Sequence, residues 1–267
     1  MTKGTTLVIG LGEVGGALAQ VLEKSQRVLR HDIERVEINE EIGVAHLCFP
    51  FHSSEQYEST AIDYLRRFSP KLAIINSTVT PGTTRRIAAA TSIPTAFSPV
   101  RGKHVQMTQD LGRYCKFVAA PDIAAARAAE EHFEQAGMKT RRINGVDALE
   151  LAKLAETTYF GVLIAYAQEL NRYCEQVGGD YYELTNFFDE IEFLPRVRYF
   201  PGFIGGHCVI PNINLMLKVA PSSLLEAVLD SNERRGVEVA GAERSQKPSD
   251  RVAATSRGEN GKTAVAR

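Results

Sequence analysis

The feature that most constrains this chain is a glycine-rich turn between a strand and a helix. The apolar run at residues 6–9 leads directly into Gly10-Leu11-Gly12-Glu13-Val14-Gly15, and a helical pattern begins at once. In such a turn the first glycine permits the tight bend, the second lets backbone approach a pyrophosphate, and the third lets helix pack on strand. A phosphate group then meets the N–H groups and positive end of the helix. The turn predicts a dinucleotide-binding site.

An acidic residue after the second predicted strand supports this interpretation. Asp32 follows the run at residues 28–31, about 20 positions beyond the turn. A carboxylate there accepts hydrogen bonds from ribose hydroxyls and repels a 2′-phosphate, so we expect NAD rather than NADP. The alternative is a glycine turn that serves packing alone. The candidate cofactor-binding residues are Gly10, Gly12, Glu13, Val14, Gly15, Asp32, Pro50, Ser77 and Thr78.

Short β-rich runs alternate with helical stretches as far as about residue 146. This alternation is typical of a parallel α/β sheet, and with the glycine turn it predicts a Rossmann-type doubly wound sheet. The predicted strands are residues 6–9, 28–31, 45–49, 72–76, 95–97, 117–119 and 140–143. The predicted helices are residues 15–23, 54–68, 82–90 and 123–135.

An α-helical domain is predicted to follow. Apolar positions at steps of three and four indicate one long helix over residues 146–177. Shorter helices are expected at 181–190, 213–219 and 222–235, with a Pro- and Gly-rich loop at 194–211. Residues 241–267 contain no Leu, Ile, Phe, Tyr or Met, so they cannot offset the entropy of ordering. We therefore expect an NAD-binding domain (1–146), a helical central or dimerisation domain (147–236) and a disordered tail (237–267).

Charge and cysteine content exclude several classes of protein. Lys plus Arg is 31 and Asp plus Glu is 32, which gives no overall field to attract nucleic acid or an anionic membrane. No apolar run approaches the ~20 residues that span a bilayer. The four cysteines lack disulfide-framework or zinc-site spacing, so we expect reduced thiols in a cytoplasmic protein and no metal site. Cys48, Cys115 and Cys174 lie in apolar patterns and are expected to be buried filler.

Two segments suggest chemistry beyond cofactor binding. Residues 76–83 follow a predicted strand at the sheet edge where ligands bind, although Ser/Thr capping explains them equally well. On the long helix, Glu150, Lys153 and Thr157 share one face, where Lys153 could face the nicotinamide. A solvated ion pair on the helix surface is the alternative.

The third such segment contains the fourth cysteine. Gly205 and Gly206 precede His207 and Cys208, and flanking glycines leave a thiol accessible. The neighbouring His207 or Lys153 could lower the pKa of this thiol and make it a nucleophile. A packed loop cysteine is the alternative.

Four stretches, taken in order, resemble the UDP-glucose/GDP-mannose dehydrogenase family of nucleotide-sugar dehydrogenases over about residues 5–236. They are GLGEVG, INSTVTPGTT, ELAKLAETTYFGVLIAYAQEL and PGFIGGHCVIP. The GGHC segment looks like the members that oxidise N-acetylhexosamine nucleotides. The resemblance implies an NAD-dependent oxidoreductase of polysaccharide biosynthesis that converts a sugar C6 alcohol to a carboxylate with two NAD⁺.

The resemblance also implies roles for individual residues. Cys208 would be the nucleophile that forms a thiohemiacetal and then a thioester, and Lys153 would stabilise the oxyanion. Thr78 would position the hydrolytic water, and His207 would lie beside the thiolate. The family's homodimer would form through the long helix, and the candidate interface residues are Tyr159, Tyr166 and Leu170.

The sequence departs from the family pattern in four ways. Val100 replaces the glutamate of the serine-proline-glutamate motif, Thr157 replaces an asparagine, and Asn212 replaces an aspartate. The chain is also expected to lack the family's third, nucleotide-gripping domain, so a partner could complete the site. Losing a general acid or base typically costs about 10²–10⁴-fold in rate. Two alternatives therefore stay open: a two-electron hydroxyacid- or prephenate-type dehydrogenase, and a non-catalytic NAD-binding regulatory or partner protein.

Overall fold

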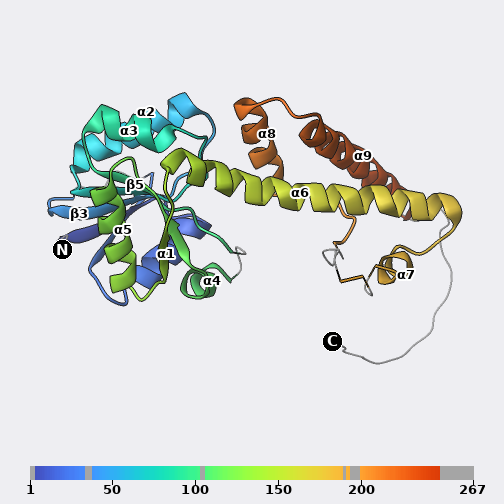
Figure 1. The fold of residues 1–267 in the computed structure, drawn as a ribbon, viewed down its shortest axis with the longest axis horizontal. Helices are drawn as coiled ribbons and strands as arrows, with labels where there is room; N and C mark the ends of the chain where they lie inside the picture. The colour runs from blue at the N-terminus through green and yellow to red at the C-terminus, as the bar shows by residue number, and fades with distance from the viewer. Residues whose placement is uncertain (1–3, 34–37, 103–105, 189–190, 193–198, 247–267) are drawn as a thin grey trace, which may run out of the picture.

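The computed structural model describes residues 4–33, 38–102, 106–188, 191–192 and 199–246. An α/β unit forms the N-terminal part, and one long helix leads from it into a helical part (Figure 1). The doubly wound sheet followed by a long-helix domain is therefore confirmed for the described residues.

A five-stranded parallel sheet organises the α/β unit, in the order β2-β1-β3-β4-β5. Its strands are β1 (Thr5–Ile9), β2 (Val28–His31), β3 (Ile42–Leu47), β4 (Leu72–Ile75) and β5 (Thr95–Phe97). Because β1 is flanked by β2 and β3, the chain winds outward from it in both directions. Open sheets of this kind bind ligands in the crevice at the carboxyl ends of the strands where the winding reverses.

Helices cover both faces of the sheet (Figure 1). Successive strand residues alternate between the faces: Leu7 and Ile9 join one apolar cluster, and Val8 joins the other. One face is covered by α2 (Ser54–Phe68), α3 (Thr83–Thr91) and the start of the long helix. The other face is covered by α1 (Glu13–Leu22), α4 (Met107–Arg113) and α5 (Ile123–Gln135). Burial on both faces explains why these strands read as continuous apolar runs.

The last two strands form a separate small sheet. β6 (Lys116–Val118) and β7 (Thr140–Arg142) pair in parallel. An antiparallel bridge between Phe97 and Ala119 attaches them to the end of β5. All seven strand regions predicted from the sequence are therefore strands, in two sheets.

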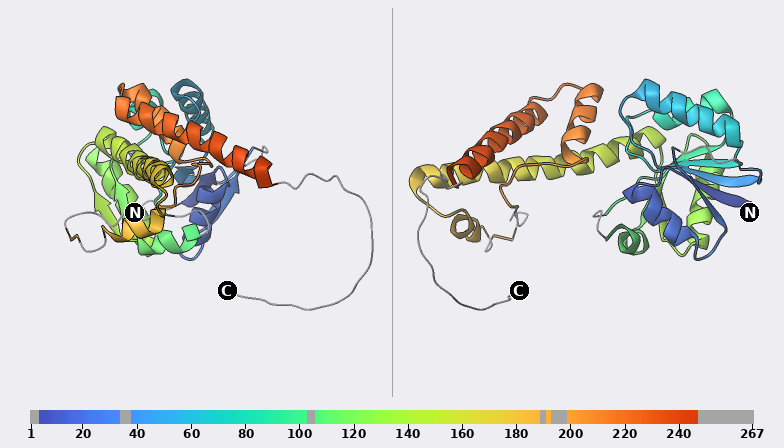
Figure 2. Two further views of the ribbon diagram at one scale, coloured as in Figure 1. Left: turned by 90° about the vertical axis from the view of Figure 1, so that its right-hand side faces the viewer. Right: turned by 180° about the vertical axis from the view of Figure 1, so that it is seen from behind.

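The helical part is arranged along α6 (Val146–Val177), which ends at Gly178 in the left-handed conformation. Then follow α7 (Tyr181–Asn186), α8 (Val209–Val219) and α9 (Ser223–Gln246). Both α8 and α9 pack against α6, α8 at a steep angle and α9 obliquely (Figure 2). Ala165, Ile213 and Val228 meet in the apolar cluster between these helices.

Several predicted boundaries were wrong. Residues 237–246 were assigned to a disordered tail but continue α9, where Glu238 pairs with Arg172 and Arg235. Residues 247–267 lie outside the described part. The helix predicted at 181–190 ends at Asn186, α8 begins at Val209 rather than 213, and α4 was not predicted. The third strand begins at Ile42 rather than at 45.

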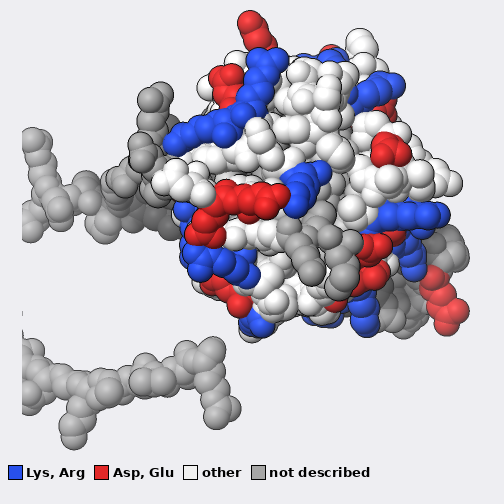
Figure 3. Space-filling model, turned by 90° about the vertical axis from the view of Figure 1, so that its left-hand side faces the viewer, with Lys and Arg blue, Asp and Glu red and all other residues white. Residues whose placement is uncertain are grey.

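Charge is mixed over the face shown in Figure 3, where acidic and basic side chains are interspersed. Within the described ranges, no helix combines the length and the apolar character that crossing a bilayer requires.

Candidate active site

Each glycine of the GxGxxG turn meets a different physical requirement. Gly10 has φ +89°, and a Cβ there would lie 2.8 Å from the Phe49 nitrogen. A Cβ on Gly15 would lie 1.8 Å from the Gly10 carbonyl oxygen, so a side chain is excluded there by packing. A Cβ on Gly12 would meet nothing within 4 Å. The first and third glycines therefore shape the turn, and the second faces open space above the first turn of α1.

Asp32 lies at the end of β2 beside this turn. Its two carboxylate oxygens accept hydrogen bonds from the backbone N–H groups of Leu11 (3.3 Å) and Ile33 (3.0 Å). The side chain remains exposed and lines a cleft of about 220 Å³ together with Gly10 and Pro50. Three of the predicted cofactor-binding residues therefore share one cleft. The remaining lone pairs of the Asp32 carboxylate could accept hydrogen bonds from ribose hydroxyls there.

The other predicted cofactor-binding residues surround the same sheet edge. Gly12 and Glu13 line a second, open hollow of about 570 Å³ between α1 and α4. Val14 packs against the α1-side apolar cluster. The Ser77 hydroxyl donates to the Phe49 carbonyl oxygen at 2.6 Å, which joins the carboxyl ends of β3 and β4. Thr78, the next residue, is half-buried.

Glu150 is a fully buried helix cap rather than part of a surface ion pair. Its carboxylate accepts hydrogen bonds from Gly82 N (2.6 Å), Thr84 N (2.9 Å) and Thr84 Oγ1 (2.6 Å) at the start of α3. Negative charge at a helix N-terminus is favourable because the N–H groups there lack intrahelical partners. The alternative interpretation, a solvated surface ion pair, is therefore wrong for Glu150. Its burial connects the first turns of α6 to the loop that follows β4.

Lys153 extends from the next turn of α6. Its side chain is only 15% exposed, and its ammonium pairs with Glu156 at 3.0 Å. Lys153 interacts electrostatically with Cys208, which is the N-cap residue of α8 and is half-buried. Glu13 of α1 also acts on this thiol. The charges of Lys153 on α6 and Glu13 on α1 therefore both act on the thiol at the start of α8.

The thiol of Cys208 is not activated in the way the sequence suggested. Burial raises its pKa above the ordinary value, and the charge of Glu13 adds to this. Lys153 acts to lower the pKa, as expected, but burial outweighs it. His207 is exposed beside Cys208. The effect of Lys153 on the pKa of the Cys208 thiol was therefore predicted correctly, but the net direction of the pKa shift was not.

The three substituted family positions are placed as follows. Val100 is buried in the apolar cluster on the α1 side of the sheet. Asn212 is buried in the first turn of α8, where its backbone N–H donates to the Cys208 carbonyl at 3.0 Å. The Thr157 hydroxyl donates to the Lys153 carbonyl oxygen at 3.3 Å. None of the three supplies a carboxylate.

A buried polar network beneath the site was missed from the sequence. Lys116 Nζ donates to the carbonyl oxygens of Ser98 (2.9 Å) and Pro99 (3.2 Å). Asn76 also donates to Ser98 O, at 2.7 Å, so its Oδ1 faces His46 Nδ1 at 2.9 Å. Burial lowers the pKa of Lys116 to about 7. The imidazole of His46 inside the strand predicted at residues 45–49 was the available signal.

The network continues to a second histidine. His46 Nε2 and His132 Nε2 lie 2.9 Å apart in the interior. If His46 donates from Nδ1 to Asn76, its Nε2 must accept when the ring is neutral, so His132 donates from Nε2. Burial lowers the pKa of both rings, which favours this uncharged arrangement.

Comparison with known proteins identifies the long-helix region. Residues 147–234 match the model described as "UDP-glucose/GDP-mannose dehydrogenase family, central domain". This range contains Lys153, Thr157, Cys208 and Asn212. Within this range the chain is similar to the central domain of that family. The resemblance drawn from the sequence motifs is thereby confirmed.

Relatives of this family match a larger part of the chain. The UDP-N-acetyl-D-mannosamine dehydrogenase of Methanocaldococcus jannaschii is 29% identical over 161 residues, which are 57% of this chain and 37% of the relative. The chain thus matches well under half the length of that curated relative.

Solved structures share the fold. UDP-D-ManNAc dehydrogenase from Pyrococcus horikoshii superposes with a TM-score of 0.75 at 20% identity, over 90% of this chain and 71% of that one. The 3-hydroxyisobutyrate dehydrogenase of Mycobacterium tuberculosis gives 0.68 at 16% identity, over 89% of this chain and 94% of that one. The fold of this chain is therefore shared by solved enzymes whose names give different substrates.

Proposed function

We propose that this chain is an NAD-dependent oxidoreductase that converts the C6 alcohol of a nucleotide sugar to a carboxylate through a covalent intermediate on Cys208. The carrying observation is that the charges of Lys153 and of Glu13, which lies in the glycine turn, both act on the Cys208 thiol. The match of residues 147–234 to the family's central domain and the names of the curated relatives support a nucleotide sugar as substrate.

The residues present fit NAD. Gly12 leaves the space above the first turn of α1 open, where backbone N–H groups can meet a pyrophosphate. The carboxylate of Asp32 lines the adjoining cleft, where it can accept both hydroxyls of an adenosine ribose and repel a 2′-phosphate. NAD, when bound, supplies the hydride acceptor for both oxidation steps.

Lys153 would act on the oxygen of the reacting carbon. When the C6 alcohol loses a hydride and a proton, negative charge develops on that oxygen, and a fixed ammonium stabilises it. The 15% exposure of the Lys153 side chain means that little water competes for this charge. Its pair with Glu156 limits the positions that the ammonium can take.

Cys208 would hold the sugar between the two oxidations. Its thiolate adds to the aldehyde carbon and forms a C–S bond, which gives a thiohemiacetal. Loss of a second hydride from that carbon leaves a thioester, and water then cleaves the C–S bond to release the carboxylate and the thiol. We assign Thr78 to position that water and His207 to lie beside the thiolate.

Two further properties belong to this proposal. The chain would form a homodimer through α6, where Tyr159 and Tyr166 are more than half exposed. Leu170 packs against Cys174 and Tyr181 of its own chain, so it is a weaker interface candidate than the two tyrosines. None of the four cysteines, all within the described residues, forms a disulfide, which suits a cytoplasmic protein.

Substrate-dependent NADH formation tests the proposal. Purified protein is mixed with NAD⁺ and UDP- or GDP-sugars, including N-acetylhexosamine forms, and small hydroxyacids are tested separately. We expect NADH to form with a nucleotide sugar. In Lys153→Met the rate should fall by about 10²-fold or more. Lys218→Met on α8 is the matched control and keeps the wild-type rate. NADH from hydroxyacids alone would favour the two-electron alternative, and NAD binding without NADH would favour the non-catalytic one.

A further inference from the structure

Two amide side chains hold the loop that leads to Cys208. Asn232 of α9 grips both polar backbone atoms of Ile204: its Oδ1 accepts from Ile204 N at 2.7 Å, and its Nδ2 donates to Ile204 O at 3.1 Å. Gln168 of α6 donates from Nε2 to the Gly202 carbonyl oxygen at 2.6 Å. We call Gln168 and Asn232 the amide clamp.

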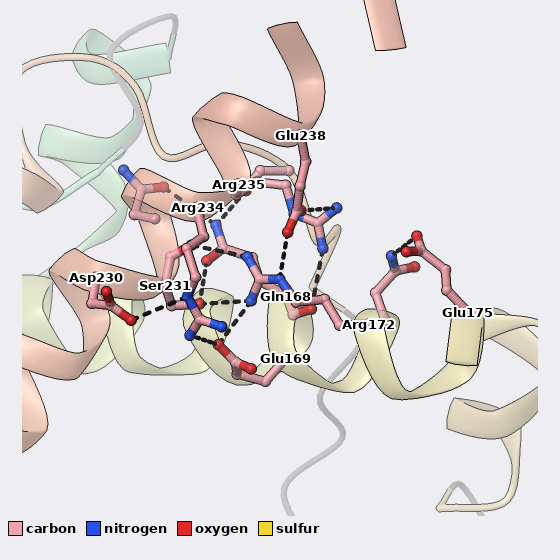
Figure 4. A network of polar contacts seen from close by, with 12 residues as sticks. Gln168, Glu169, Arg172, Glu175, Asp230, Ser231, Arg234, Arg235 and Glu238 are labelled. Carbon is pink, nitrogen blue, oxygen red and sulfur yellow. Dashed lines mark hydrogen bonds and ion pairs between the residues drawn. The ribbon is translucent and has the colours of Figure 1, made fainter. Parts of the chain in front are cut away.

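The amide clamp is itself fixed by its surroundings. Gln168 Oε1 accepts from the Ser231 hydroxyl at 3.0 Å, and its Nε2 also donates to Asn232 Oδ1 at 3.3 Å. Arg235 donates to the Gln168 backbone oxygen at 3.1 Å. Figure 4 shows Gln168, Ser231 and Arg235 within one network between α6 and α9. Because both amides are buried, neither can rotate without leaving polar atoms unpaired.

Apolar contacts complete the attachment. Ile204 is buried with Val209 and Ile213 in the cluster between α6, α8 and α9. The Phe203 ring lies against Gly236 of α9, since a Cβ added to Gly236 would lie 3.1 Å from Phe203 Cε2. The segment from Gly202 to Ile204 is therefore fixed to the α6–α9 pair rather than to the α/β unit.

Cys208 lies between two fixed points. Ile204 is held by Asn232, and beyond Cys208 the first turn of α8 closes through Asn212 N and Cys208 O. Gly205, Gly206 and His207 between them are exposed. The position of the thiol relative to Lys153 therefore depends on where Ile204 is held.

We propose that Gln168 and Asn232 are positioning residues that set the place and burial of the Cys208 thiol. The inference rests on the proposed function only in that Cys208 is taken as the reactive group. Without Asn232, the N–H and C=O of Ile204 would be buried without partners, so the loop would open to reach water. Opening would expose the thiol, whose burial is what raises its pKa.

Alkylation of Cys208 by iodoacetamide tests the inference. The rate is measured between pH 6 and 9 by mass spectrometry of the Cys208 peptide, which separates it from the other three thiols. We expect Asn232→Ala to alkylate about fivefold faster or more at pH 8, with a profile shifted to lower pH. Hydrogen exchange at the Ile204 amide should accelerate about tenfold.

The control lies on the same pair of helices. Arg234→Ala removes the ion pairs of Arg234 with Glu169 and Asp230 without touching the loop, and should leave the alkylation profile unchanged. If Asn232→Ala fails to fold, Gln168→Met serves instead, because methionine has a volume similar to that of glutamine but lacks the amide. Alkylation about twofold faster than in the wild type is then expected.

A wild-type alkylation profile in Asn232→Ala, with faster exchange at Ile204, would overturn the inference. The readout uses no substrate, so failure of the proposed oxidation would leave this result interpretable. Equal acceleration in Arg234→Ala would also overturn it, because general loosening of the α6–α9 pair would then be the cause.

Discussion

Two buried ionisable side chains in the α/β unit have opposite surroundings. Glu150 accepts three hydrogen bonds at the start of α3, so its charge is matched by N–H and O–H donors. Lys116 donates to two backbone carbonyls and lies 4.9 Å from the centre of the Phe133 ring. Burial is the main cause that lowers its pKa; Lys153 and Arg101 add to this, and Cys48 acts in the opposite direction. Burial raises the pKa of the Glu150 carboxyl while its three donors act to lower it, whereas both burial and the neighbouring cations lower the pKa of Lys116.

Truncation of Glu150 should be costly. Glu150→Ala leaves the N–H groups of Gly82 and Thr84 without acceptors, and we expect the free energy of unfolding to fall by about 3 kcal/mol. Asp147→Ala, one turn earlier, removes an exposed pair with Arg85 and should cost less than about 1 kcal/mol. Urea unfolding of both variants measures the difference. Equal losses would contradict the assigned role of Glu150.

Lys116 should make stability depend on pH. Its pKa is about 7 in the folded chain and near 10.5 in the unfolded chain, so between these values the unfolded state binds more protons. The free energy of unfolding should therefore rise as pH increases from 7 to 9, whereas well below pH 7 both states hold the proton and this contribution stays constant. In Lys116→Met this contribution is absent. Urea unfolding at pH 7, 8 and 9 gives the slope of the unfolding free energy against pH for the wild type and for Lys116→Met. Equal slopes would contradict the assigned effect of Lys116.

Glycine at one point of α6 determines how closely α8 can approach. A Cβ at Gly161 would lie 2.8 Å from Val209 Cγ1 and 3.0 Å from Ile213 Cδ1. Because Val209 directly follows Cys208, a displacement of α8 also displaces the thiol. The two helices that carry Lys153 and Cys208 therefore meet at a position that only glycine fits.

Substitution at this crossing should be destabilising. Gly161→Ala overpacks the contact, and we expect a loss of about 1–3 kcal/mol despite the better helix propensity of alanine. Gly112→Ala in α4 is the matched control, because its Cβ would meet nothing within 4 Å, and it should stabilise the fold by about 0.5–1 kcal/mol. Thermal unfolding followed by circular dichroism checks the sign. A stabilised Gly161→Ala would contradict the packing argument.

Local pattern was sufficient for elements whose periodicity is strong. The bounds of α2, α5 and α6 follow from amphipathic spacing and from caps such as Ser53, Asp122 and Gly178. By contrast, α4 is one short helix stabilised by contact with α1, and the end of α9 depends on Glu238 reaching Arg172. Such contacts between distant segments leave no local signal.

The residues of the candidate site also fall into two groups: those that local sequence could predict and those that depend on distant partners. The turn glycines and Asp32 could be located because their roles depend on backbone geometry at fixed spacing. The capping by Glu150 and the burial of Lys116 depend on partners 66 and 18 residues away, respectively. The raised pKa of Cys208 likewise depends on burial rather than on its sequence neighbours.

Taken as a whole, the molecule exposes an aromatic surface on α6 that assembly would cover. Tyr159 and Tyr166 are 57% and 55% exposed, and Tyr173 is 61% exposed. Burial of such rings is a large part of the free energy of association. We expect a dimer in sedimentation-velocity experiments that Tyr166→Arg dissociates without loss of helix content. Tyr182→Arg on α7, equally exposed, should leave the dimer intact; a monomeric wild type would contradict this assembly.

The most direct test of the proposed chemistry is the number of NADH molecules formed per nucleotide sugar consumed. Two are expected for the wild type, because the thioester route removes two hydrides from one carbon. Cys208→Ser should form at most one and release aldehyde, whereas Cys174→Ser, a buried thiol in α6, should keep two. One NADH per sugar in the wild type, or two in Cys208→Ser, would contradict the account.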